Sequence, residues 1–228
     1  DAVDRLCQEV IEVHGAVHIL VNNAGLSHCG DFLAHDLEVW QRILGVNLMG
    51  VVHGCRSFLP HLLAQDEAHI VNISSLFGLI GIPGQSAYCT TKFAVRGLSE
   101  SLWIELAETQ VGLTVVHPGG IATNIVNNSS FEVPGLKDHM QSIFSQNMMS
   151  AEQAAERIVR AVERNHRRVL ITAEARIGDW LKRMMPVRAV RLFSEMMNKA
   201  MKLEPFQSGV MLAPPREDPL GGEGIDEP

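Results

Sequence analysis

The sequence predicts an α/β fold in which a parallel β-sheet carries helices on both faces, giving three layers. Short β-branched runs alternate with longer segments of helical periodicity through most of the chain, which is the pattern of repeated βαβ units. Parallel sheets are buried on both faces, and the apolar character of the runs fits this. With 228 residues, of which 46% are hydrophobic, the chain can bury the core of one such domain.

Each predicted element rests on its own pattern. The first helix places Val3, Leu6 and Val10 at helical spacing, and the first strand is a β-branched run that ends at a turn. Glycines at 45, 50 and 54 weaken the second helix, so they indicate close approach of another element. Helices are expected over residues 1–14, 38–63, 93–106 and 151–162, and strands over residues 17–21, 69–73, 112–116 and 168–172.

Three segments fall outside this alternation. Residues 125–150 are a loose mixture of Ser, Asn, Met and Phe, typical of a flap or of short helices over a site. Residues 176–204 are basic, methionine-rich and amphipathic, with a break expected at Pro186. Residues 205–228 are rich in proline, glycine and acidic side chains and are expected to be disordered.

Charge and cysteine usage argue against several classes of protein. The net charge of −7 argues against a nucleic-acid partner, because phosphate binding requires a basic face. The four cysteines lack metal-type spacing and the histidines form no HExxH pair, so no metal site is expected. The spacing of the cysteines suggests free thiols, as in a reducing compartment. The sequence also shows no signal segment and no apolar run long enough to span a membrane, so a cytoplasmic protein is expected.

The only tyrosine of the chain, Tyr88, stands one helical turn before Lys92. Side chains at i and i+4 share one face of a helix, so the phenol and the ammonium can approach the same point. A cation nearby lowers the pKa of a phenol from its usual value of about 10. Such a tyrosine can act as general acid or base toward a carbonyl or an alcohol. The plain alternative is a tyrosine and a lysine on a helix surface.

Two further polar residues lie where they can meet this pair. Ser75 follows the strand predicted over residues 69–73, and ligands of open parallel sheets bind beyond the carboxyl ends of the strands. Its hydroxyl can stabilise charge on a substrate oxygen, and no GxSxG motif marks it as a hydrolase nucleophile. Asn47 is an amide in an apolar helix, so it needs a partner, which can be a neighbouring backbone group or a functional one.

These residues and their spacing resemble the short-chain dehydrogenases and reductases, an oxidoreductase family with the Rossmann fold. The likeness extends over about residues 1–172. It implies hydride transfer between NAD or NADP and a carbonyl or secondary alcohol. The motifs that carry it are, in order, Asn22-Asn23-Ala24-Gly25, Asn47, Ile73-Ser74-Ser75, Tyr88-x-x-x-Lys92 and Pro118-Gly119-Gly120-Ile121-Ala122-Thr123.

The resemblance also implies a role for each matching residue. Tyr88 would be the general acid or base, and Lys92 would lower its pKa and bind the nicotinamide ribose. Ser75 would orient the substrate oxygen, and Asn47 would hold a water that links Lys92 to solvent. The implied cofactor-binding residues are Asn23, Ala24 and Gly25, which would also brace the central strand, together with Tyr88, Lys92, Pro118, Gly119, Ile121 and Thr123.

Family members also begin with a strand, a glycine-rich turn and a helix whose amino terminus holds the cofactor diphosphate. This sequence opens in a predicted helix, so residues 1–175 are expected to be a partial dinucleotide-binding and catalytic domain. Either the chain is part of a longer, working oxidoreductase, or it is a genuine short form. Such a short form would have lost diphosphate binding and would serve as an interaction protein. The presence of all four residues implied for catalysis, Asn47, Ser75, Tyr88 and Lys92, favours the first alternative.

Expectations about substrate and partners rest on apolar residues. The flap side chains would form an adaptable lid for a hydrophobic substrate, unless they only pack on the sheet. Residues 176–204 could lie on a membrane, close the pocket or contact another subunit. The family commonly forms homo-oligomers, and Gly97 and Ser101 would let a second helix approach. The flap side chains are Phe131, Val133, Leu136, Ile143, Phe144, Met148 and Met149.

Overall fold

The computed structural model describes residues 2–30, 32–33, 35–131, 135, 137–138, 141–142 and 148–201. A four-stranded sheet forms the centre of this part, and each pair of neighbouring strands is parallel. The strands lie in the order β1 (Ile19–Asn22), β3 (Ala68–Ile73), β4 (Val111–His117) and β8 (Arg168–Leu170). The predicted α/β fold with a parallel sheet is confirmed.

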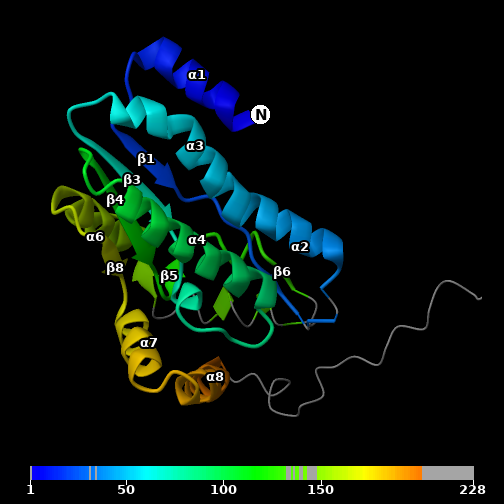
Figure 1. Cartoon of the computed structure of the whole chain (residues 1–228). Helices are drawn as coiled ribbons and strands as arrows, with labels where there is room; N and C mark the ends of the chain where they lie inside the picture. Colours follow the sequence, from blue (N-terminus) through cyan, green and yellow to red (C-terminus); the bar gives the residue numbers. More distant parts are fainter. Residues whose placement is uncertain are drawn as a thin grey trace, which may run out of the picture.

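Helices cover both faces of this sheet (Figure 1). Helices α3 (Gly50–Leu63) and α4 (Ser86–Glu105) lie on one face, where Ile70 of β3 packs in their core. Helix α6 (Ala151–Glu163) lies on the other face, where it covers Val71. Because side chains alternate along a strand, successive residues of β3 serve opposite layers. Helix α1 (Ala2–His14) packs on α3.

The helix predicted over residues 38–63 forms as a continuous rod with one irregular turn. Helix α2 (Leu37–Leu44) runs through a π-helical turn, Gly45–Met49, into α3. This wider turn places Asn47 in the core, fully buried. Turns of this kind recur at functional sites. Of the three glycines expected to mark a close approach, Gly54 does so, since a Cβ there would collide with the side chain of Asn22. The expectation was wrong for Gly45, which faces open space, and for Gly50, where a Cβ would make an ordinary contact.

Helix α4 begins at Ser86, so Tyr88 and Lys92 lie on one helix as their spacing predicted, whereas the apolar period had indicated a start at residue 93. Its first turns bury the polar residues Tyr88, Thr91 and Lys92. The buried face of these turns therefore lacks the periodic apolar residues by which a helix is recognised in a sequence. After β8, α7 (Ala173–Met184) and α8 (Arg188–Met201) separate around Pro186, as predicted. Two short parallel pairs were not predicted: β2 (His28–Cys29) with β6 (Ser130–Phe131), and β5 (Ile121–Ala122) with β7 (Met149–Ser150). The tail expected to be disordered lies outside the described residues.

Candidate active site

The residues expected to carry the chemistry meet at the carboxyl edge of the parallel sheet. Strand β3 ends at Ile73, and Ser75 caps a short 3₁₀ helix, in which its Oγ accepts a hydrogen bond from the Phe77 N–H (3.1 Å). Helix α4 packs against this short helix and carries Tyr88 and Lys92 in its first two turns. Ligands of parallel α/β sheets bind at this edge.

Lys92 is a buried cation next to the end of β3. Its Nζ donates a hydrogen bond to the carbonyl oxygen of Ile73 (2.9 Å) and lies 5.6 Å from the centre of the Tyr88 ring. Burial disfavours the charged form, so the pKa of Lys92 falls to about 8. The side chain is therefore mostly an ammonium at pH 7, and it has further N–H groups to donate into the site.

The pKa of Tyr88 is raised, whereas the sequence predicted that it would be lowered. Burial raises the pKa of its phenol to about 12, and the Phe77 ring lies edge-on to it, with ring centres 6.3 Å apart. The neighbouring Ser75 side chain acts in the opposite direction and lowers this pKa, by less than burial raises it. The net lowering expected from Lys92 is thus not observed, because loss of hydration is the larger effect. Tyr88 holds its proton at neutral pH.

Asn47 joins the π-helical turn to the loop after β1. Its Oδ1 accepts from the Leu26 N–H (2.7 Å), while its Nδ2 donates to the Leu26 carbonyl (2.8 Å) and to Thr91 Oγ1 (3.1 Å). The two bonds to Leu26 agree with the alternative that this amide binds a neighbouring backbone group. A Cβ added to Gly25 would lie 3.5 Å from Lys92 Nζ and 3.6 Å from Asn47 Oδ1. Gly25, Asn47 and Lys92 therefore border one small space.

A buried histidine holds the backbone of Ser75. The Nδ1 of His117 lies 2.9 Å from the Ser75 carbonyl oxygen, and since a carbonyl only accepts, this nitrogen carries the proton. Burial lowers the pKa of His117 to about 4, so the ring stays neutral at ordinary pH. Sequence reasoning missed this residue, because a histidine at the end of an apolar strand carries no motif of its own.

The loop after β4 reaches the same edge. The Leu76 N–H donates to the Pro118 carbonyl (2.7 Å), which ties the start of this loop to the Ser75 turn. Ile121 is buried and packs in the core beside α6, whereas Thr123 is exposed. Of the residues expected to contact the cofactor here, Pro118 thus lies next to the Ser75 turn, and the Ile121 side chain serves the core.

The turn after β1 is braced by Asn22. Its Nδ2 donates to Asn72 Oδ1 (2.9 Å), and Asn72 Nδ2 donates to Ser99 Oγ (3.0 Å), so a polar chain crosses from β1 through β3 to α4. Asn23 and Ala24 are exposed. The bracing expected of residues 23–25 therefore falls on Asn22. Sequence reasoning missed Asn72 and Ser99, since each meets its partner only in the folded chain.

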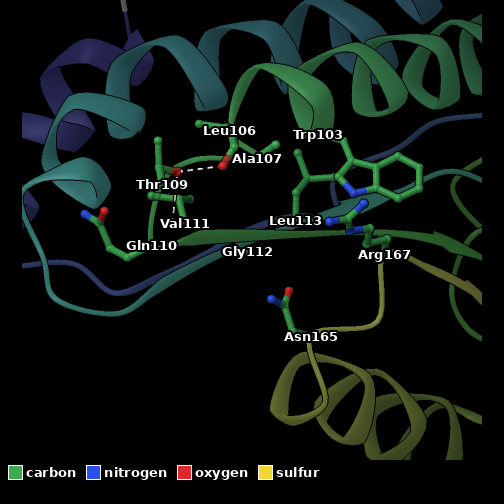
Figure 2. Close-up of a pocket in the computed structure, with 10 residues that line it drawn as sticks. All are labelled: Trp103, Leu106, Ala107, Thr109, Gln110, Val111, Gly112, Leu113, Asn165 and Arg167. Carbon is green, nitrogen blue, oxygen red and sulfur yellow. Dashed lines mark hydrogen bonds between the residues drawn. The ribbon is translucent and has the colours of Figure 1, made fainter.

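A separate pocket lies at the other end of β4 (Figure 2). Strand β4 begins at Val111 in this pocket and ends at His117, which contacts Ser75. The Arg167 guanidinium lies over the Trp103 ring, 5.0 Å from its centre. Because ligands bind at the opposite edge of such sheets, the candidate active site is at the carboxyl end. The pocket is lined by Trp103, Leu106, Ala107, Thr109, Gln110, Val111, Gly112, Leu113, Asn165 and Arg167.

The chain is similar to known proteins in both sequence and fold. Residues 1–133 match the family model of the short chain dehydrogenases. The oxidoreductase SadH of Mycobacterium tuberculosis is 41% identical over 189 residues, 81% of this chain and 68% of that protein. A 3-alpha-(or 20-beta)-hydroxysteroid dehydrogenase of Mycobacterium bovis is 41% identical over 113 residues, 50% of this chain and 44% of that protein. A short chain dehydrogenase/reductase structure from Burkholderia phymatum, in complex with NAD, has a TM-score of 0.74 and 28% identity, covering 80% of this chain and 70% of that one.

Proposed function

Because this chain belongs to the short-chain dehydrogenase family and is an oxidoreductase of that family, we propose that it transfers hydride between NAD or NADP and a carbonyl or secondary alcohol. One observation carries the proposal: the ring of Tyr88 lies 5.6 Å from the buried ammonium of Lys92, and the Ser75 side chain is near enough to lower the pKa of its phenol. These three groups lie at the edge of the sheet where ligands bind.

Tyr88 moves the proton in the proposed reaction. With its pKa at about 12, the phenol is protonated at neutral pH and can donate to a carbonyl oxygen as that oxygen gains negative charge. Ser75 can donate a second hydrogen bond to the same oxygen. For alcohol oxidation the same phenol must first lose its proton, and the nearby ammonium of Lys92 favours that form.

The space bordered by Gly25 suits the nicotinamide end of a cofactor, which supplies or accepts the hydride when bound. A Cβ at residue 25 would narrow the opening beside Lys92 Nζ and Asn47 Oδ1. An ammonium there can donate to the hydroxyls of a ribose. We assign ribose binding to Lys92 and Tyr88, a supporting role to Asn47, and the remaining cofactor contacts to Asn23, Ala24, Gly25, Pro118, Gly119, Ile121 and Thr123.

The proposed substrate is hydrophobic. The Phe77 ring stands against Tyr88, and Phe131, Met148 and Met149 are half-buried on the segment expected to form the flap. Met149 also packs with the core beside α6, which agrees with the alternative that the flap side chains only pack on the sheet. The related hydroxysteroid dehydrogenase is named for an apolar substrate. The other flap residues, Val133, Leu136, Ile143 and Phe144, lie outside the described residues.

A paired substrate assay tests this function. The protein is incubated with NADH or NADPH and either a steroid or aromatic ketone or an aldose, and loss of the reduced cofactor is followed by absorbance. We expect kcat/KM for the apolar ketone to exceed that for the sugar by about a hundredfold, since a polar substrate gains little in an apolar pocket. No turnover of either class would contradict the function. A preference for the sugar would contradict only the substrate class.

We also propose a homo-oligomer that uses the outward face of α4. Phe93 is 39% exposed and Ile104 is 76% exposed on this helix, and open space lies beside Gly97. A glycine between exposed apolar side chains lets a second helix come close and cover them. This face fits the small residues, Gly97 and Ser101, that the sequence placed there.

Helices α7 and α8 present the surface that we propose for contact with an anionic membrane. Ile177, Trp180 and Met184 are 51%, 61% and 64% exposed and are spaced along one face of α7, which Arg176 and Arg183 flank. Exposed apolar side chains with flanking arginines are typical of helices that lie on a membrane surface. Within the described residues, no helix is long and apolar enough to cross a membrane. The four cysteines form no disulfide there, so we propose the cytoplasmic side.

Vesicle sedimentation tests the membrane contact. Replacing both Trp180 and Met184 with serine should weaken binding to phosphatidylserine vesicles about a hundredfold, because each buried apolar side chain contributes on the order of 1.5 kcal/mol, or about a factor of ten. Val13→Ser removes an exposed apolar residue from α1 and should leave binding unchanged. Equal pelleting of the two variants, or no pelleting of the unchanged protein, would remove this proposal.

A further inference from the structure

We infer that Glu174 is a positioning residue that holds the loop after β4 in place for the nicotinamide cofactor. Neither the sequence pattern nor the resemblance to a family singles this residue out. The inference rests on the proposed function, because residues 118–123 are the loop to which cofactor contacts were assigned. Glu174 itself acts through the loop and is not assigned a contact with the cofactor.

The contact is a hydrogen bond from a backbone amide to a carboxylate. The Gly120 N–H donates to Glu174 Oε1 at 2.8 Å. Glu174 lies in the first turn of α7, more than fifty positions along the chain from the loop. Hydrogen bonds to an ionised acceptor are about twice as strong as neutral ones. The start of α7 therefore holds the middle of the loop.

Neighbouring side chains pack closely around Gly119 and Gly120 of the loop. A Cβ at Gly119 would collide with Thr172 Oγ1 and Glu174 Oε1, and a Cβ at Gly120 would collide with the sulfur of Met148. Only glycine allows backbone and side chains to come this close. The loop is thus confined by the start of α7 on one side and by Met148, at the end of the flap segment, on the other.

The same loop is fixed to the short 3₁₀ helix that Ser75 caps. The Leu76 N–H of that helix donates to the Pro118 carbonyl (2.7 Å), so the loop is held at its start by the Ser75 turn and two residues later by Glu174. Helix α7 is itself anchored to β8, since Arg168 forms an ion pair with Asp179. A site held by rigid elements keeps its geometry better than a loop alone. Glu174 therefore links the cofactor loop to the body of the protein.

The competing explanation is that Glu174 only stabilises its helix, because a carboxylate in the first turn of any helix interacts favourably with the helix dipole. Helix α2 supplies a matched control. Glu38 occupies the same second position of that helix, which packs on α4. Glu38→Ala removes the same dipole interaction and leaves the loop contact in place. A difference between the two alanine variants thus reports the loop contact.

The first measurement needs no cofactor. Amide hydrogen exchange of residues 118–123 should become about tenfold faster in Glu174→Ala, because the Gly120 N–H loses its acceptor. Glu174→Gln keeps an acceptor oxygen and should exchange within about threefold of the unchanged protein. Glu38→Ala should match the unchanged protein. Equal exchange in the two alanine variants would overturn the inference.

The second measurement is the Kd for NADH and NADPH, followed by the fluorescence of the reduced nicotinamide. Glu174→Ala should raise the Kd about tenfold, Glu174→Gln by less than about threefold, and Glu38→Ala not at all. Faster exchange with an unchanged Kd would overturn the positioning role. No binding by the unchanged protein would overturn the proposed function, and with it the role toward a cofactor, while the exchange result would still decide whether Glu174 holds the loop.

Discussion

Tyr88→Phe should lower kcat by about a hundredfold to ten-thousandfold while the fold stays intact, because it removes the proton donor with little change in volume. The phenol is buried beside Phe77, so a phenylalanine ring fits the same space. Stability should fall by no more than about 1 kcal/mol, because the ring keeps its contact with Phe77 and only the polar contact of the hydroxyl is lost. Steady-state kinetics and thermal unfolding measure the two effects separately.

The control for this variant is another hydroxyl on the same helix. Thr90 is exposed on α4, where its Oγ1 donates to the Ser86 carbonyl (2.8 Å). Thr90→Val removes that hydroxyl without touching the site and should keep near wild-type turnover. If Tyr88→Phe retained turnover as well, the assignment of Tyr88 as general acid or base would be wrong.

Lys92→Met should abolish most of the activity and yet make the protein more stable at pH 7. The ammonium is buried, and its pKa falls to about 8 from an ordinary value of 10.5. This difference corresponds to a penalty of about 3 kcal/mol for burying the charge. The hydrogen bond to Ile73 returns about 1 kcal/mol of it. We expect the uncharged methionine to raise the free energy of unfolding by about 2 kcal/mol.

The pH dependence of this gain has a definite sign. Below pH 8 the lysine is protonated in both the folded and the unfolded state, so the penalty is complete. Between pH 8 and 10.5 the folded state loses its proton first, and the unchanged protein should gain stability as the pH rises. The advantage of Lys92→Met should shrink over the same range. Urea unfolding at a series of pH values measures it.

Lys182→Met is the matched control, because that ammonium lies on α7 and donates to the Pro186 carbonyl away from the site (2.7 Å). It should neither stabilise the protein at pH 7 nor change the pH dependence. A Lys92→Met variant that is less stable than the unchanged protein at pH 7 would contradict the burial penalty. In that case the hydrogen bond from Lys92 to Ile73 at the end of β3 would stabilise the protein by more than the burial of the charge destabilises it.

The alternation of strands and helices could be predicted because it depends on local periodicity. The start of α4 could not be predicted from apolar periodicity, which indicated residue 93, because the first turns bury the polar residues Tyr88, Thr91 and Lys92. The spacing of Tyr88 and Lys92 did predict a helix there. The π-helical turn at Asn47 was also missed, since no single residue distinguishes it from a regular helical turn. Both exceptions lie at the candidate active site, where function overrides the local rule.

The sequence by itself determined the fold class, the family and the four residues proposed for catalysis, because spacing along a helix or after a strand is written in the order of the residues. Only the tertiary structure revealed that burial raises the pKa of Tyr88 and lowers that of Lys92. It alone brought His117 to Ser75 and Glu174 to Gly120. Hydration and contacts between distant segments depend on the folded chain, so no local pattern in the sequence records them.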